Sequence, residues 1–440
     1  MKTTVRIGCG AGFSGDRLDP AVTLVERGQL DYLVLECLAE RTIALAQKRK
    51  RQNPALGYDP LLERRIESLL PALLDNGVRL ITNMGAANPL AAGETVCEIA
   101  RRLNRSLTVA VVTGDDVLHQ LTGDEPGLET GQPLRQSGTL LSANAYLGAD
   151  AILPALATGA HVIITGRVAD PSLFVAPLAH EFGWSLDDTD RIGQGTVVGH
   201  LLECAGQLTG GYFADPGRKD VPDMVQLGHP FADVSADGTA VFGKVAGTGG
   251  LLNTATASEQ LLYEVMDPSH YLTPDVVADF TQVRLEQVGP NQVRAAGGRG
   301  RVRPDTLKVS VGYDAEYVGE GELAYAGANA LARAKLAGAI LQERLLRQFP
   351  DLRVDYIGST SVHRTNFGYV PEPYEIRLRV AGRASTASEA ALIGEEVEAL
   401  YTNGPAGGGG ARKYLHEVVG IVSTLLPRHQ VTPTVTLLQV

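Results

Sequence analysis

Short apolar runs rich in β-branched residues alternate with helical patterns through the first half of the chain. Such nearly continuous apolar runs, separated by helices, are typical of a parallel sheet covered on both faces. The pattern predicts strands at 5–8, 31–36, 78–82, 107–112 and 161–165, with helices at 38–52, 59–74 and near 89–103. Asp19 followed by Pro20, with Gly28 as a stop, predicts a further helix that begins near Pro20. We therefore expect a Rossmann-like, three-layer α/β lobe.

The pattern changes after about residue 225. Turn signals at 236–238 and 289–291 predict two hairpins, which are formed by 232–235 with 239–244 and by 281–287 with 292–296. Further strands are expected at 307–313, 353–357, 374–380, 418–424 and 434–440, with helices at 323–347 and 385–401. We predict two domains, 1–225 and 226–440, the second an α+β lobe with a mixed or antiparallel sheet. The polar segment 215–228 would connect them.

Polar residues follow all five predicted strands of the first lobe. In order along the chain they are Asp16 and Arg17, Glu36, Asn83 and Asn88, Asp115 and Asp116, and Arg167 and Asp170. Ligands of open α/β sheets bind beyond the carboxyl ends of the strands, so these residues predict a small-molecule site. Asn88, Asp115 and Asp170 also suit helix N-caps, and that alternative stays open for each of them.

The loop after the first strand contains GxGxxG at Gly10, Gly12 and Gly15, and Glu36 ends the next strand, as in a dinucleotide fingerprint. That fingerprint requires a helix that starts inside the glycine run, so that its amides face the pyrophosphate. Here the helix is expected only near Pro20, and Asp16 would repel a phosphate. We therefore favour a loop that covers a ligand, with a purely structural glycine turn and nucleotide binding as alternatives.

Three other features can carry chemistry. His200, Glu203 and Cys204 share one helical face, which suits a buried polar pair better than metal ligation. Lys244 precedes a glycine turn, where it would bind a carboxylate or phosphate, act as a base, or simply lie on the surface. The glycine run 404–410, followed by Arg412 and Lys413, predicts an anion-binding loop. The metal content stays open, because Glu36, Asp115 and Asp116 offer oxygen ligands but no spacing demands an ion.

The composition narrows the class of protein. The net charge of -11 opposes binding to nucleic acid or to an anionic membrane. No apolar run reaches the ~18 residues of a membrane span, and the N-terminus lacks a signal-peptide core. Four cysteines without a CxxC pair suit reduced thiols in the cytoplasm. We expect a cytoplasmic metabolic protein that forms a homo-oligomer.

Several long segments resemble the acyclic terpene utilisation (AtuA) family, in the same order and from residue 6 to about 425. They are GAGFSGDR, LDYLVLECLAERT, TNMGAANP, ITGRVADPSL, HLLECAGQLTGGYFADPG, DGTAVFGKVAGTGGLLN and NGPAGGGGAR. The resemblance implies a role in the bacterial breakdown of acyclic terpenoids through branched acyl-CoA intermediates, and it identifies no catalytic residue. Many members carry or accompany a small ferredoxin-like C-terminal domain, which we expect this chain to lack.

The favoured function is an enzyme with lyase or hydratase chemistry on a carboxylate or acyl-CoA intermediate, in which CoA belongs to the substrate and no other cofactor is identified. We expect catalysis from Asp16, Glu36 and Asp170, and substrate binding from Arg17, Asn83, Asn88, Asn144, Arg167, Lys244, Gly12 and Gly408. An NAD(P)-dependent oxidoreductase and a non-catalytic subunit of a pathway complex are the alternatives.

Overall fold

The computed structural model describes residues 2–363 and 372–440. The chain forms two compact units, one of residues 1–312 with 421–440 and the other of residues 313–420. The boundary that we predicted near residue 225 lies inside the first unit. The physical reason is strand pairing, because both predicted hairpins extend the first sheet instead of building a second one.

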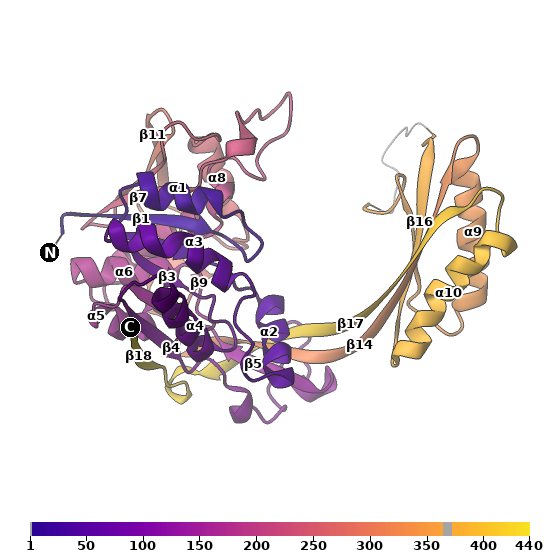
Figure 1. The fold of residues 1–440 in the computed structure, drawn as a ribbon, viewed down its shortest axis with the longest axis horizontal. Helices are drawn as coiled ribbons and strands as arrows, with labels where there is room; N and C mark the ends of the chain where they lie inside the picture. Colours follow the sequence, from indigo (N-terminus) through magenta and orange to yellow (C-terminus); the bar gives the residue numbers. More distant parts are fainter. Residues whose placement is uncertain (1, 364–371) are drawn as a thin grey trace. The chain divides into compact units, whose positions relative to one another are not determined.

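The first unit is built on a ten-stranded mixed sheet (Figure 1). Its parallel part has the order β1 (Thr4–Ala11), β2 (Tyr32–Leu35), β3 (Arg79–Thr82), β6 (Val162–Thr165) and β4 (Thr108–Thr113). These are the five predicted strands, and the mixed α/β class is confirmed. The chain leaves β3 for β4 and returns to β6, which lies between them.

Antiparallel strands extend this sheet on both sides. Beyond β1 follow β7 (Pro230–Ser235), β8 (Ala240–Lys244), β12 (Gln292–Ala296) and β11 (Arg284–Gly289). Beyond β4 lies β18 (Thr434–Gln439), which pairs Thr434 with Thr113 and Gln439 with Thr108. The last strand of the chain therefore completes the sheet that the first strand begins.

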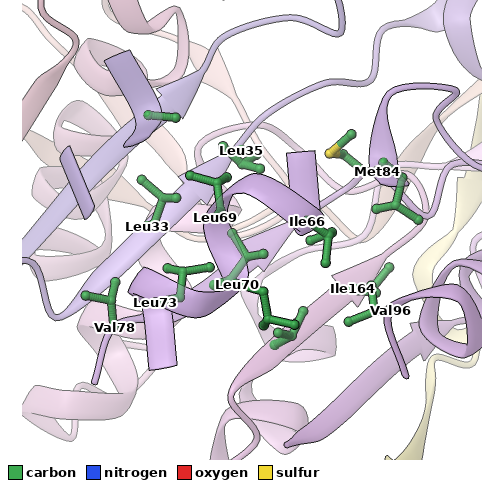
Figure 2. Packing of buried hydrophobic residues seen from close by; sticks show 14 of the residues in the cluster. Leu33, Leu35, Ile66, Leu69, Leu70, Leu73, Val78, Met84, Val96 and Ile164 are labelled. Carbon is green, nitrogen blue, oxygen red and sulfur yellow. The ribbon is translucent and has the colours of Figure 1, made fainter. Parts of the chain in front are cut away.

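Helices cover both faces of the parallel strands. One face carries α1 (Asp19–Arg27), α3 (Leu62–Asp75) and α4 (Pro89–Arg102), and the other carries α5 (Ala149–Ala157), α6 (Ser172–Phe182) and α7 (Thr189–Glu203) (Figure 1). Figure 2 shows how Leu69, Leu70 and Leu73 of α3 pack against Leu33 and Leu35 of β2. Fully burying such side chains stabilises the fold by about 1.5–3 kcal/mol each.

Smaller elements of the first unit surround the carboxyl ends of the strands. They are α2 (Glu40–Gln52), β5 (Leu140–Ala145), α8 (Thr254–Leu262) and a three-stranded sheet of β9 (Tyr271–Leu272), β10 (Val277–Asp279) and β13 (Arg299–Arg301). Helix α8 begins with a capping box, in which the Asn253 side chain accepts from Ala255 and Thr256 amides.

The second unit has the element order βαββαβ. It comprises α9 (Ala330–Leu345), β15 (Arg353–Ile357), β16 (Glu375–Ala384), α10 (Ala387–Asn403) and parts of the long strands β14 (Thr306–Ala326) and β17 (Gly409–Pro427). The strand order β15-β16-β14-β17 is that of a ferredoxin-like split βαβ motif. The unit of residues 313–420 therefore has a ferredoxin-like topology.

One predicted helix begins too early. Residues 323–326 belong to strand β14, and α9 starts only at Ala330. The pairing of β14 with β16, from Tyr317 opposite Ala384 to Ala326 opposite Glu375, explains the difference. Leu323 and Tyr325 are buried on alternate positions of this strand, so tertiary pairing decides the local structure.

No helix in the described part of the chain is long and apolar enough to cross a membrane.

Candidate active site

A cavity of about 990 Å³ lies beyond the carboxyl ends of β1, β2 and β6. The loops after these strands supply Gly12 to Arg17, Glu36 to Glu40 and Ala169 to Pro171 to its walls, and all lining residues belong to the first unit. Its volume suits a substrate of drug or cofactor size. Five of the predicted site residues line this cavity, namely Gly12, Asp16, Arg17, Glu36 and Asp170.

Glu36 is a buried carboxylate at the cavity wall and is only 7% exposed. Its Oε1 accepts hydrogen bonds from the Leu38 amide at 2.8 Å and from Nδ2 of Asn83 at 2.9 Å. Burial, together with the negative charge of Asp170, raises the pKa of Glu36 well above its usual value. Asn83 therefore acts on the site through Glu36, which it orients, and not as a wall residue.

Arg167 is fully buried, and its guanidinium contacts several residues that line the cavity. Its guanidinium donates to the Leu38 carbonyl and to Oδ1 of Asp170, and it lies 4.2 Å from the ring centre of Tyr146. Both Nη groups of Arg167 are thus directed at protein groups, while its buried Nε has no hydrogen-bond partner among the described residues. The structure places it as a support for the cavity wall, whereas the sequence suggested that it binds substrate.

Asp170 is a cavity residue that pairs with Arg167 and whose charge acts on Glu36 and Glu203. Its carboxylate is 2.5 Å from Nη2 of Arg167, and its side chain is 35% exposed. Burial raises the pKa of Asp170 although Arg167 opposes the shift. The negative charge of Asp170 in turn raises the pKa values of both Glu36 and Glu203.

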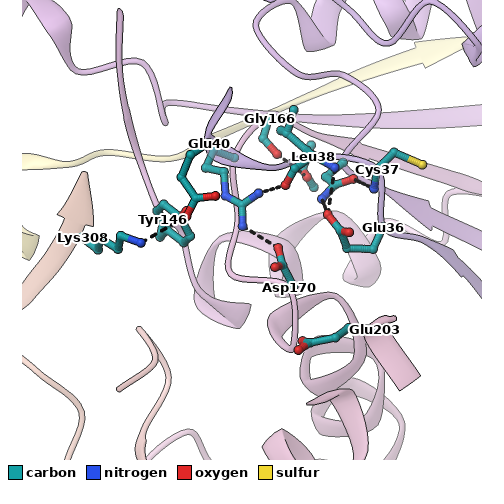
Figure 3. A network of polar contacts seen from close by, with 12 residues as sticks. Glu36, Cys37, Leu38, Glu40, Tyr146, Gly166, Asp170, Glu203 and Lys308 are labelled. Atoms are coloured by element: carbon teal, nitrogen blue, oxygen red, sulfur yellow. Dashed lines mark hydrogen bonds and ion pairs between the residues drawn. The ribbon is translucent and has the colours of Figure 1, made fainter. Parts of the chain in front are cut away.

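A second polar cluster lies near the cavity entrance. The Tyr146 hydroxyl donates to Oε1 of Glu40 at 2.5 Å, and Nζ of Lys308 lies 3.2 Å from the same oxygen (Figure 3). Burial raises the pKa of Glu40, but the Tyr146 hydrogen bond and the charges of Arg167 and Lys308 together lower it to about 2. Glu40 is therefore ionised near neutral pH, and Lys308, 43% exposed, lies at the same wall.

Glu203 is a cavity residue that was absent from the predicted site. It ends α7, and its Oε1 lies 2.8 Å from Nδ1 of His200. Burial raises the pKa of Glu203 to about 7, while His200 opposes the shift and Asp170 adds to it. The spacing of His200 and Glu203 indicated a buried polar pair, and this is what the structure contains. What that spacing could not indicate is that α7 ends at the cavity.

The loop after β1 separates the glycines from the helix. Gly10 lies within β1, and α1 begins at Asp19, so no helix amides face the glycine run. Oδ2 of Asp16 accepts from the Gly12 amide at 2.7 Å, and Arg17 donates to the Val225 carbonyl at 2.8 Å. The late helix start, which argued against a dinucleotide site, is confirmed.

Replacing Gly12 with Ala is expected to lower the free energy of unfolding by about 1–3 kcal/mol. A Cβ at this position would lie 2.5 Å from the carbonyl carbon and 2.6 Å from the Cα of Cys204, which are backbone atoms. Urea unfolding followed by the fluorescence of Trp184, the single tryptophan, measures the effect. Gly15→Ala is the matched control, because its Cβ would meet only the exposed Phe13 ring. Equal stability of the two variants would contradict the explanation.

The remaining predicted residues lie outside the cavity wall. Nδ2 of Asn88 donates to the Pro54 and Leu56 carbonyls, and Nζ of Lys244 donates to the Thr248 carbonyl at 2.6 Å, so both secure loops. Asn144 donates to Oδ2 of Asp115 at 2.8 Å. Gly408 belongs to the second unit, where an added Cβ would meet Leu323 at 2.9 Å.

The described residues contain no group of three or more His, Cys, Asp and Glu side chains arranged to hold a metal ion. Asp115 is buried and accepts from the Arg167 amide at 2.9 Å as well as from Asn144. Asp116 instead accepts from Nε2 of Gln47 at 3.0 Å. The carboxylates of Asp115 and Asp116 are thus engaged with protein donors.

Apolar side chains line the outer part of the same cavity and are unusually exposed. Phe13 is 60% exposed, Leu272 61% and Tyr212 88%. Leu128 and Leu425 add further apolar surface there. The cavity therefore combines carboxyl groups at the strand ends with an apolar wall, which suits a ligand that has one reactive polar group and an apolar part.

Fold and cavity together define a mixed α/β protein with an acid-lined ligand site at the carboxyl ends of its parallel strands. Comparison with protein families matches residues 5–437 to the family described as acyclic terpene utilisation family protein AtuA. The chain belongs to this family, as its sequence motifs indicated. Comparisons with curated proteins and with solved structures gave no match.

Proposed function

We propose that this member of the AtuA family is an enzyme that adds water to, or removes water from, a carboxylate or acyl-CoA intermediate. The observation that carries the proposal is the convergence of Glu36 and Asp170 on one cavity, with burial raising the pKa of each. Carboxyl groups with raised pKa values exchange protons efficiently near neutral pH.

In the dehydration direction, one carboxylate takes the proton from the carbon next to the carbonyl. The C–OH bond then breaks, a carbon–carbon double bond forms, and the hydroxyl leaves as water with a proton from an acid. Glu36 suits the base, because both donors to its Oε1 stabilise the carboxylate form. Burial and, after it, the negative charge of Asp170 raise the pKa of this base.

The cations at the wall suit the anionic part of such a substrate. Lys308 and Arg17 both line the cavity and are exposed enough to reach a carboxylate or a phosphate. The apolar surface around Phe13 and Leu272 would hold the hydrocarbon part. Asp16, at the same wall, accepts from the Gly12 amide and is proposed to position the loop for catalysis.

The proposal is tested by incubating the purified full chain with branched hydroxyacyl-CoA esters, the matching unsaturated esters and the free acids in deuterated water. Mass spectrometry should detect gain or loss of one water and deuterium at the carbon next to the carbonyl. Failure of all these substrates would contradict the proposal. Reduction of NAD(P) instead would support an oxidoreductase, and stable co-purification with another enzyme without turnover would support a non-catalytic subunit.

A further inference from the structure

His200 and Glu203 form a buried pair, and Glu203 lines the cavity. His200 is 1% exposed and Glu203 is 7% exposed, and only Glu203 contributes to the cavity wall. The two residues lie one turn apart at the end of α7, with Nδ1 of His200 2.8 Å from Oε1 of Glu203. Within this pair, His200 lies in the interior of the first unit and Glu203 lies at the cavity wall.

Two atoms of this pair lack a hydrogen-bond partner within residues 2–363 and 372–440. They are Oε2 of Glu203 and Nε2 of His200, both fully shielded from solvent. A buried polar atom without a hydrogen-bond partner destabilises the fold. Such a cost at a ligand cavity is explained if Oε2 of Glu203 meets the polar group of a bound substrate.

The surroundings hold the histidine ring in a fixed orientation. The ring centres of Tyr271 and Phe280 lie 5.3 Å and 5.5 Å from that of His200. Tyr271 belongs to β9, and Phe280 directly follows β10. The His200 carbonyl accepts from Nε2 of Gln260 at 3.0 Å. A ring held this firmly keeps Nδ1 directed at Glu203, which fixes the Glu203 carboxyl in turn.

Burial, more than the surrounding charges, favours the protonated form of Glu203. It ends a helix, where the negative end of the helix dipole disfavours a carboxylate. The titratable groups that face it are His200 from the same helix, Asp170 after β6, Glu264 after α8, Tyr271 of β9 and the adjacent Cys204. Only His200 in this set supplies a positive charge, and burial lowers its pKa while Glu203 raises it above the usual value.

We infer that Glu203 is the catalytic acid of this site and that His200 is the positioning residue that holds it. The inference rests on the proposed hydration and dehydration reaction. Glu203 gives the proton on Oε2 to the leaving hydroxyl, which departs as water. The Glu203 carboxylate that forms then accepts the Nδ1–H bond of His200 through Oε1. In the direction of hydration, the attacking water gives a proton to Oε2, which restores the protonated form of Glu203.

The test compares Glu203→Gln, His200→Asn and the control Asp190→Asn, which removes a carboxylate from the opposite end of α7. We expect wild-type turnover to fall as pH rises through about 7, because the acid loses its proton. Glu203→Gln should lower turnover by about 10²-fold and remove this limb of the pH profile. His200→Asn should move the limb to higher pH, because the histidine no longer favours the carboxylate. The control should keep both the rate and the limb.

Infrared titration of the carboxyl groups separates this inference from the proposed function. A protonated carboxyl band should titrate near pH 7 in the wild type, vanish in Glu203→Gln and move to higher pH in His200→Asn. If no substrate is turned over but the band behaves in this way, the proposed reaction fails, whereas Glu203 is still shown to be a protonated carboxyl group that His200 holds. The inference would be overturned if Glu203→Gln kept the wild-type rate and the wild-type fall in turnover above pH 7. It would also be overturned if this fall stayed at the same pH in folded His200→Asn and His200→Gln.

Discussion

Replacing Glu36 with Gln is expected to lower turnover by about 10²–10⁴-fold while the fold is kept. The amide oxygen of Gln can accept the same hydrogen bonds from the Leu38 amide and from Asn83, so the local structure has no reason to change. What is lost is the group that takes the proton. The rate of deuterium incorporation, measured with whichever ester is turned over, reports this step directly.

The control for Glu36→Gln is Glu94→Gln, which makes the same chemical change on the exposed side of α4. It should retain the wild-type rate. Asn83→Ala should reproduce part of the loss, because it removes one donor that orients Glu36. Wild-type turnover by folded Glu36→Gln would exclude Glu36 as the base.

Replacing Arg167 with Met is expected to lower the free energy of unfolding by about 1–3 kcal/mol. The substitution keeps a similar buried volume but leaves the Asp170 carboxylate and the Leu38 carbonyl without the guanidinium that binds both. The Leu38 carbonyl loses its donor inside the protein, whereas the Asp170 carboxylate, which is 35% exposed, is partly compensated by water. Denaturant unfolding followed by Trp184 fluorescence measures it in the first unit.

Two comparisons make this prediction specific. Arg102→Met breaks an exposed ion pair with Glu67 and should cost about 1 kcal/mol or less. Adding Asp170→Asn to Arg167→Met should restore part of the stability, because the unpaired charge is then removed. Equal stabilities of Arg167→Met and Arg102→Met would show that the buried network contributes little.

The sequence predicted the local structure and the place of the site better than it predicted which groups each side chain contacts. Apolar runs identified the five parallel strands, and the polar residues after them pointed to the edge where the cavity lies. The pattern could not show that Arg167 turns inward to the Leu38 carbonyl, or that Lys244 binds its own turn through Thr248. Orientations of this kind depend on neighbours that are distant in the sequence.

Pairing between distant segments explains the other differences. Each hairpin was recognisable from its turn residues, but the edge to which it adds is decided by pairing with more distant segments, such as Val5 opposite Val234 and Phe242 opposite Val293. Glu203 was recognised as half of a polar pair and missed as a cavity residue for the same reason. Its place depends on the close approach of the α7 end to Gly12.

The position of β18 in the sheet has a consequence for synthesis. Residues 434–439 pair with β4, so the β4 edge stays uncovered on the ribosome until nearly the whole chain has emerged. The unit of residues 313–420 is contiguous and emerges before that edge is covered. A nascent chain that stalls before residue 434 should therefore expose the backbone groups of β4 from Thr108 to Thr113, a template for pairing with other chains.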